Sequence, residues 1–258
     1  MSLDKQDFVA CVRRAKVCPM AFTKYILDMP YEFSPNQKCV LMDFYGFPFP
    51  CPFNEECWRC NITPVSLYDE LVLVMGRKSA KTEMSADATL FEVYKLLQIK
   101  EPRKYYRLAK KNIYAMNVAT NRDQAIDVTF DAILTLAESS WYLEECIVDV
   151  REKGGELEFY KNIIALAHSS SARGGRGYQC IVIIFDEIGH YIDTKTGNQS
   201  GTMVYNALKP NVKPFKWRGD GKVINISSPA GRQGILWENY WYVMQDQIIG
   251  ALENEAGK

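Results

Sequence analysis

The stretch LVLVMGRKSAKT, residues 71–82, decides the expected fold. Its first part, Leu71 to Met75, is a run of large apolar side chains, which is typical of a strand buried on both faces of a parallel sheet. A short polar loop follows from Gly76. Residues 82–98 then repeat apolar side chains at helical spacing. The stretch therefore predicts a fully buried strand, a loop and a helix in direct succession.

The loop has the residue types that hold a phosphate group. Its backbone N–H groups and the helix dipole favour an anion, Lys81 would reach the β- and γ-phosphates, and Thr82 would hold Mg²⁺. This is the pattern of a Walker A loop, although its form GxxxxGK[ST] has glycines where this chain has Met75 and Ala80. Because alanine is the smallest side chain after glycine, we expect Ala80 to fit with modest strain. The expected nucleotide-binding residues of the loop are Gly76, Arg77, Lys78, Ser79, Ala80, Lys81 and Thr82. The alternative is a basic surface turn.

A second apolar run ends in two adjacent carboxylates. Ile181 to Phe185 are all large and apolar, and Asp186 and Glu187 follow directly. Open α/β sheets bind ligands at the C-terminal ends of their strands. In this Walker B pattern Asp186 would hold Mg²⁺, and Glu187 would polarise the attacking water as general base. By itself the run also fits a strand that ends in a solvated acidic turn, but beside a phosphate loop it favours an ATPase.

The rest of the chain alternates between expected strands and helices. Strands are expected at Ile113–Val118, Cys146–Val150, Leu157–Tyr160, Asn162–Ala167 and Val223–Ile226, and helices at residues 1–30 and Asp123–Leu136. The pair Gly154-Gly155 marks a hairpin between two of these strands. Strands that alternate with helices imply a mostly parallel sheet covered on both faces. We therefore predict an α/β fold.

Two further motifs have polar side chains suited to a nucleotide. The amide of Gln37 can pair with an adenine edge, although it also fits an exposed residue that opens a helix after Pro35. The strand Val223–Ile226 ends in Ser227 and Ser228. Their hydroxyls could sense a phosphate and couple its loss to movement, and the alternative is an ordinary turn before a proline.

The order of these motifs resembles that of the large terminase subunit of tailed bacteriophages, the ATP-driven motor that packages DNA into the procapsid. The ATPase half of that family has a glutamine segment, a degenerate Walker A loop of the form G-R-x-S-[GA]-K-T, a strand ending in DE and a Ser/Thr coupling motif. The matching positions here are Gln37, Gly76–Thr82, Ile181–Glu187 and Ser227–Gly231. Arg77 and the segment Ala119–Ala125 are further marks of the resemblance. It covers roughly residues 30–240.

The resemblance implies a P-loop NTPase fold of the ASCE/RecA-like kind, with a mostly parallel central sheet flanked by helices and a small N-terminal helical subdomain. We expect one ATPase domain over residues 1–245, made of a helical lid part with a Pro-rich insertion (1–64), a P-loop core (65–232) and a C-terminal lid or linker segment (233–258). Large terminases usually continue into a nuclease domain. We expect that domain to be absent, and no nuclease activity from this chain.

The resemblance also suggests an arginine finger, a residue that stabilises transition-state charge on the phosphates. In the glycine-rich loop Ser169–Gly177, Arg176 matches the family spacing better than Arg173 and would act on a neighbouring subunit. The alternative for this loop is a flexible solvated segment. Arg77 is the competing candidate, acting within its own subunit.

A basic segment, KEPRKYYRLAKK at residues 100–111, is the expected DNA contact. Cations interleaved with tyrosines can bind phosphates and stack on bases. The candidate residues are Arg103, Lys104, Arg107, Lys110 and Lys111. A solvated face of a connecting segment is the alternative.

Composition limits the class of protein. With 258 residues, 47% apolar and 24% charged, the chain is neither disordered, nor collagen-like, nor a disulfide-dense miniprotein. The 31 basic residues balance 31 acidic ones, which argues against nucleic-acid binding by overall charge alone. No apolar run approaches the ~18 residues that span a bilayer, and the N-terminus does not resemble a signal peptide. We expect a cytoplasmic protein with no membrane partner.

The cysteines are expected to be free thiols, because disulfides are rare without a secretory signal. Cys51, Cys57 and Cys60 include a CxxC pair in a Pro-rich loop. A zinc site there lacks a nearby fourth ligand, since His168 and His190 are far along the chain. Zinc is therefore not expected.

Together these patterns predict a Mg²⁺-dependent ATPase that drives translocation of double-stranded viral DNA into a procapsid, in the cytoplasm of a bacterial host. By resemblance its partners are DNA, the portal protein, the small terminase subunit and further copies of itself in a ring. We expect a pentamer on the procapsid and a monomer in isolation. The alternatives are a helicase-like DNA translocase and a non-catalytic assembly module that binds nucleotide.

Overall fold

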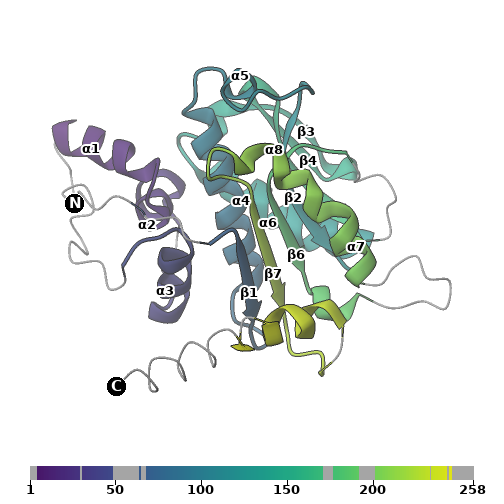
Figure 1. Ribbon diagram of the computed structural model, residues 1–258. Coiled ribbons are helices and arrows are strands. Elements are labelled where there is room, and N and C mark those ends of the chain that lie inside the picture. The colour runs from purple at the N-terminus through teal and green to yellow at the C-terminus, as the bar shows by residue number, and fades with distance from the viewer. Residues whose placement is uncertain are drawn as a thin grey trace, which may run out of the picture.

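The structure is a computed structural model that describes residues 5–29, 31–48, 64, 68–170, 177–191, 201–232, 234–242, 244 and 245. Within these residues one seven-stranded sheet has the order β1-β7-β6-β2-β5-β4-β3 (Figure 1). The strands are β1 (Glu70–Val74), β2 (Ile113–Ala119), β3 (Ile147–Arg151), β4 (Glu156–Phe159), β5 (Ile163–Ser169), β6 (Cys180–Asp186) and β7 (Lys222–Ser227). All pairs are parallel except β3–β4 and β4–β5. The expected α/β fold with a mostly parallel sheet is confirmed.

The helices lie on both faces of this sheet. They are α1 (Lys5–Ala15), α2 (Pro19–Phe22), α3 (Pro35–Phe44), α4 (Lys81–Leu97), α5 (Pro102–Tyr105), α6 (Asp131–Ser139), α7 (Gly201–Leu208) and α8 (Lys213–Lys216). The π-helical segments η1 (Thr23–Leu27) and η3 (Gln124–Phe130) extend α2 and lead into α6. Residues 234–242 are also helical. None of the described helices combines the length and apolar content that crossing a membrane requires.

Alternation along the strands explains why both faces are covered. On β2, Ile113 and Ala115 pack into the core formed with α4 and α6, whereas Met116 and Val118 pack into the core formed with α7. Successive side chains of a strand point to opposite faces. The apolar runs therefore build two cores, one on each side of the sheet.

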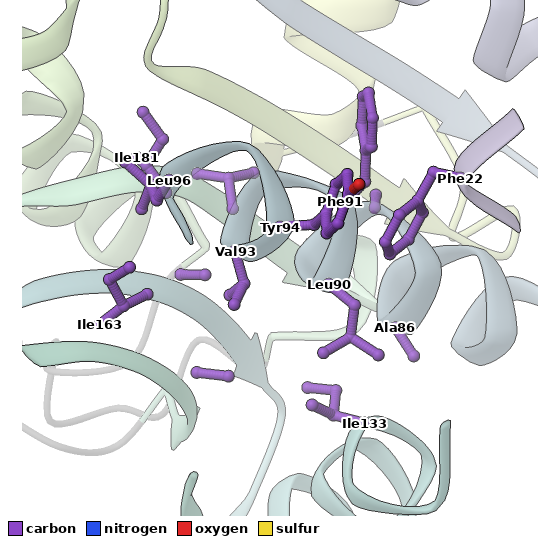
Figure 2. Close-up of a cluster of buried hydrophobic side chains, with 14 of the residues drawn as sticks. Phe22, Ala86, Leu90, Phe91, Val93, Tyr94, Leu96, Ile133, Ile163 and Ile181 are labelled. Carbon is purple, nitrogen blue, oxygen red and sulfur yellow. The ribbon is translucent and has the colours of Figure 1, made fainter. Parts of the chain in front are cut away.

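Helix α4 occupies the centre of the larger core and is buried on almost every side. Figure 2 shows its side chains reaching Phe22 of α2, Ile133 of α6, and Ile163 and Ile181 of the sheet. The Phe22 ring lies 5.4 Å from that of Phe91 and 5.2 Å from that of Tyr94. A helix that is buried on almost every side depends on its neighbours for its stability. The N-terminal helices thus complete the core around α4.

The expectation that Leu71–Met75 is fully buried is wrong. Strand β1 pairs only with β7 and forms one edge of the sheet, and Val74 is 41% exposed. A pocket of about 560 Å³ lies along its outer side, lined by residues that include Phe44, Leu71 and Tyr240. An apolar run indicates a strand, but its burial depends on the strand order, which the run does not encode.

One buried carboxylate makes the stability of this core sensitive to pH. Asp87 of α4 has no exposed surface, and its Oδ1 accepts a hydrogen bond of 2.7 Å from Thr23 Oγ1. Its Oδ2 has no hydrogen-bond partner among the residues that the structure describes. Burial raises the pKa of Asp87 to about 7, against a weaker opposing effect of the Thr23 hydrogen bond. The folded state therefore holds this proton more tightly than the unfolded chain does.

We predict that Asp87→Asn makes the fold more stable at alkaline pH. The wild type loses stability as pH rises toward 7, because ionisation of Asp87 is disfavoured only in the folded state. The variant's advantage in free energy of unfolding should grow by on the order of 3 kcal/mol between about pH 5 and pH 8, since each pKa unit corresponds to about 1.4 kcal/mol. Urea unfolding at both pH values measures it. Asp127→Asn, on the exposed side of η3, is the matched control, and an equal pH response in both variants would contradict this account.

Candidate functional site

The loop between β1 and α4 is held in a strained conformation. Lys78 and Ala80 have φ values of 60° and 57°, in the left-handed region that favours glycine. This costs roughly 1–2 kcal/mol per residue. A Cβ added to Gly76 would meet nothing within 4 Å, so the one glycine of the loop is not required for space. Strain of this kind often accompanies a binding loop, where the surrounding structure maintains it.

Lys81 lies at the first position of α4 and folds back over this loop. Its Nζ donates a hydrogen bond of 3.1 Å to the carbonyl oxygen of Gly76, which also accepts a bond of 2.7 Å from Ser79 Oγ. The same Nζ lies 3.3 Å from Oε1 of Glu187. The ammonium group is thus placed between the loop and the acidic end of β6.

Gln37 connects the N-terminal helices to the loop. At the start of α3, its Oε1 accepts a bond of 2.6 Å from the Ser34 N–H within a capping box. Its Nε2 donates a bond of 2.8 Å to the carbonyl oxygen of Ser79. Both ends of the amide therefore contact protein in this structure, and contact with adenine stays a prediction.

The sheet order brings the remaining motifs to one edge. Strand β7 lies between β1 and β6, and all three run parallel, so the loop, the acidic pair and the two serines share the C-terminal edge of the sheet. This is the edge where open α/β sheets bind ligands.

Asp186 is almost fully enclosed at this edge, with 3% of its surface exposed. Burial and the charge of Glu187 raise its pKa to about 6, although Lys81 and a hydrogen bond from the Gln124 side chain act in the opposite direction. The environment supplies too little positive charge to favour the carboxylate fully. A cation beside it would therefore be stabilising.

Glu187 is fixed through both of its oxygens. Its Oε2 accepts hydrogen bonds of 2.8 Å from the Ser228 N–H and 2.9 Å from the Ser228 hydroxyl, and the Ser227 hydroxyl lies 3.2 Å away. Its Oε1 contacts Lys81. Partial burial raises the pKa of Glu187, but the hydrogen bonds from Ser228 and the charge of Lys81 outweigh this and lower it. The ionised form of Glu187 is thus favoured at this site.

The sequence motifs did not reveal two residues of this network. His190 Nε2 lies 2.8 Å from Ser228 Oγ, and Gln124 contacts both Asp186 and the Thr120 hydroxyl. Because the Ser228 hydroxyl donates its hydrogen to Glu187, His190 supplies the hydrogen of the second bond. Its place four residues after Asp186, at the end of the short 3₁₀ helix Ile188–His190, was the available signal.

Several expected site residues take no part in these contacts. Arg77 and Lys78 are exposed on the loop, and neither forms a hydrogen bond or ion pair with the residues that the structure describes. Arg173, Arg176 and the cysteines Cys51, Cys57 and Cys60 lie outside the described residues.

The basic segment at residues 100–111 precedes β2, at the opposite edge of the sheet from the loop. Arg103 bonds to the carbonyl oxygens of Leu108 and Ala109, Lys110 bonds to that of Gly177, and Lys104 pairs with Glu101 at 2.6 Å. Three of the five expected DNA contacts therefore already have a hydrogen-bond or ion-pair partner in the protein, and a fourth, Arg107, lies over the Trp217 ring.

The residues at the C-terminal end of β6 and the start of α4 fit a magnesium ion. Mg²⁺ prefers a few protein oxygens together with water and phosphate oxygens. Among the described residues, no three His, Cys, Asp or Glu side chains are grouped as a metal cage. Asp186, a buried carboxylate that lacks compensating charge, and the Thr82 hydroxyl at the start of α4 suit such a partial set of ligands.

One solved structure shares the fold of this chain with a TM-score above 0.5. A search of curated proteins found no match. The crystal structure of the HK97 bacteriophage large terminase is similar with a TM-score of 0.56 at 17% identity, over 86% of this chain and 38% of that one. The chain thus spans well under half of that relative. The Thermus phage P74-26 large terminase ATPase domain gives a TM-score of 0.47 at 18% identity, over 65% and 62% of the two chains.

The expected fold is confirmed by the HK97 structure, which at this identity speaks for the fold alone. A family model described as "Uncharacterized protein MJ0330, N-terminal P-loop domain" matches residues 2–251, almost the whole chain. The phosphate-loop topology at the edge of the sheet and this match lead to one conclusion: the chain belongs to the MJ0330 N-terminal P-loop domain family.

Proposed function

We propose that this P-loop domain binds ATP at residues 76–82 and hydrolyses it, with Glu187 as general base. One observation supports the proposal most directly. The two oxygens of Glu187 are held by different elements, Oε1 by Lys81 of the phosphate loop and Oε2 by Ser228 at the end of β7. Glu187 is thus connected both to the loop that would bind the phosphates and to the strand β7, which would move when the phosphates leave.

The geometry suggests how the site changes when nucleotide binds. A triphosphate would compete with Glu187 for the ammonium group of Lys81, and its greater charge would draw that group away. Oε1 would then be released to accept a proton from water, while Ser228 keeps Oε2 in place. Mg²⁺ held by Thr82 and Asp186 would supply charge neutralisation at the phosphates.

The work that this hydrolysis drives is proposed from the fold and the motif order. We infer that the chain is the ATPase domain, over residues 1–245, of a motor that moves double-stranded DNA into a procapsid in a bacterial host. The likeness to the HK97 large terminase supports this. The partners would be portal protein, small terminase subunit and a ring of like chains. Arg176 acting on a neighbour or Arg77 acting within its own subunit would be the arginine finger, and Gln37 would contact adenine.

We predict Mg²⁺-dependent ATP turnover that depends on Lys81 and Glu187. Glu187→Gln should lower kcat by roughly 10²–10⁴-fold, because the general base is lost, while nucleotide binding persists. Lys81→Ala should lose both binding and turnover, because the phosphates lose their cation. Turnover and the binding of a fluorescent ATP analogue measure the two effects. Glu138→Gln, on the exposed side of α6, is the control.

Equal background rates in the wild type and all three variants would contradict the proposal. Retained nucleotide binding with no turnover would then favour the non-catalytic assembly module. A helicase-like translocase shares the site, and it differs in separating the strands of a forked duplex. Strand separation by the wild type would therefore replace the packaging motor with that alternative.

We also predict that Ser228→Ala lowers kcat roughly tenfold with little change in KM, because a hydrogen bond to a charged group is worth about 1.5–3 kcal/mol and the backbone N–H of residue 228 remains. His190→Phe should have a smaller effect in the same direction. Steady-state kinetics measures both. Ser139→Ala, whose hydroxyl bonds only within α6, is the control. A rise in KM with unchanged kcat would mean that Ser228 binds nucleotide and does not position Glu187.

A further inference from the structure

A cluster of arginines and aromatic rings lies at the N-terminal ends of β2 and β7, whereas the phosphate loop lies at the C-terminal ends of the parallel strands. This arginine–aromatic surface consists of Tyr105, Arg107, Trp217 and Arg218. The guanidinium carbon of Arg107 lies 4.9 Å from the centre of the Trp217 ring, and that of Arg218 lies 4.3 Å from both the Trp217 and the Tyr105 rings. Trp217 and Tyr105 are 48% and 40% exposed. Figure 1 shows α5, which ends at Tyr105, and α8, which ends just before Trp217, at the same end of the molecule.

Charge is concentrated at this surface although the whole chain is neutral. Residues 100–111 contain six cations and one carboxylate, and residues 213–218 contain three cations and no carboxylate. Nearby acids already have partners: Glu101 pairs with Lys104, and Asp69 pairs with Lys216 at 2.9 Å. Within the part of the chain that the structure describes, no carboxylate forms an ion pair with Arg107 or Arg218. No described carboxylate therefore offsets the charge of either guanidinium group, which leaves both available to an anionic ligand.

The surface is rigid, and part of it is strained. Arg107 has a φ of 56°, in the left-handed region, at a cost of roughly 1–2 kcal/mol. The turn around it is closed by a bond of 2.9 Å from the Leu108 N–H to the Arg103 carbonyl oxygen. Trp217 Nε1 donates a bond of 3.3 Å to the carbonyl oxygen of Tyr106, which fastens the two segments together. These bonds thus keep both segments, and the guanidinium groups that they carry, close to the rings.

This arrangement favours phosphate over bases as the ligand. A guanidinium that lies over an aromatic ring still has N–H groups free at its outer side. Two of these N–H groups can donate hydrogen bonds to two oxygens of one phosphate. The Trp217 and Tyr105 rings already carry the guanidinium groups, so they hold the arginines in place and are not open platforms for base stacking. Contact with the backbone alone reads no sequence.

We propose that Tyr105, Arg107, Trp217 and Arg218 form a surface that binds the phosphate backbone of duplex DNA without sequence preference. The inference deepens the proposed function, on which it rests, by naming where the DNA would contact this domain. It also revises the expected contacts. Arg107 is retained and Arg218 is added, whereas Arg103 bonds within its own loop and Lys110 bonds to the carbonyl oxygen of Gly177.

The surface is joined to the nucleotide edge by rigid elements. Asp220, next to it in the chain, accepts a bond of 2.9 Å from the Tyr106 hydroxyl and lies 3.2 Å from Lys95 Nζ on the last turn of α4. Helix α4 begins at Lys81 and, with 17 residues, is about 25 Å long. Strand β7 likewise begins at Lys222 and ends at Ser227. DNA bound here would therefore lie beside the C-terminal end of α4, which begins at Lys81, and the N-terminal end of β7, which ends at Ser227.

The test measures the binding of duplex DNA to the full chain by fluorescence anisotropy over a range of salt concentrations. Replacing both arginines (Arg107→Ala with Arg218→Ala) should weaken binding at least about tenfold. It should also reduce the slope of log Kd against log salt by about two, because roughly one counterion is released per neutralised phosphate. The double variant Arg13→Ala with Lys16→Ala removes the same charge from exposed positions on and just after α1 and should stay within about twofold of the wild type.

Each outcome decides the inference. Equal losses in the two double variants, or normal binding by the first, would overturn it, as would a wild type that binds no duplex. If the alanine variant melts early, the pair Arg107→Lys with Arg218→Lys replaces it. That pair keeps the charge and loses the fork, so it should bind about threefold more weakly with an unchanged salt slope. Single-stranded DNA of the same length should bind no more tightly than the duplex, and tighter binding would mean that bases are contacted.

Binding is measured without nucleotide, which separates this inference from the proposed ATPase activity. A wild type that binds DNA through these arginines but shows no turnover would support the surface and reject the ATPase. In the opposite case, normal turnover with normal DNA binding by the first double variant would reject the surface and leave the ATPase standing. The DNA-independent turnover of that variant should equal that of the wild type.

Discussion

Helix α4 is enclosed by the N-terminal helices, by α6 and by the sheet, and the positions of the functional groups depend on this enclosure. Its first residues are Lys81 and Thr82, so the packing of Phe91 and Tyr94 in the core also fixes where the ammonium and hydroxyl groups lie. The burial must offset the strain at Lys78 and Ala80, which together costs roughly 2–4 kcal/mol. A loop of this kind keeps its shape only while the helix behind it is held on every side.

The same enclosure of α4 also determines how Glu187 is held. Because α4 and β7 cannot move freely, Lys81 and Ser228 approach the two oxygens of Glu187 from fixed directions. A ligand that removes one of these contacts leaves the other in place. Burial raises the pKa of the neighbouring Asp186 despite the charge of Lys81. Under the proposed function, a metal ion that arrives with the nucleotide would favour the ionised form of this carboxylate.

The sequence predicts these elements well where the signal is local. The apolar run at Ile181–Phe185, the strand before Ser227 and the helix after the phosphate loop all follow from patterns within a few residues. Burial of β1 was predicted wrongly because it depends on which strands become neighbours. Helices α5 and α8 have four residues each, too few to show a period. Sequence patterns did not predict roles for His190 and Arg218, because their partners, Ser228 and Tyr105, lie far away along the chain.

The central claim is that Lys81 leaves Glu187 when the phosphates arrive, while Ser228 keeps its hold. A crystal structure with Mg²⁺ and a non-hydrolysable ATP analogue tests it most directly. The account predicts that the distance from Lys81 Nζ to Glu187 Oε1 grows well beyond its present 3.3 Å, with Ser228 Oγ still close to 2.9 Å from Oε2. An analogue bound at the loop with the Lys81–Glu187 contact intact, or with Glu187 released from Ser228 instead, would contradict it.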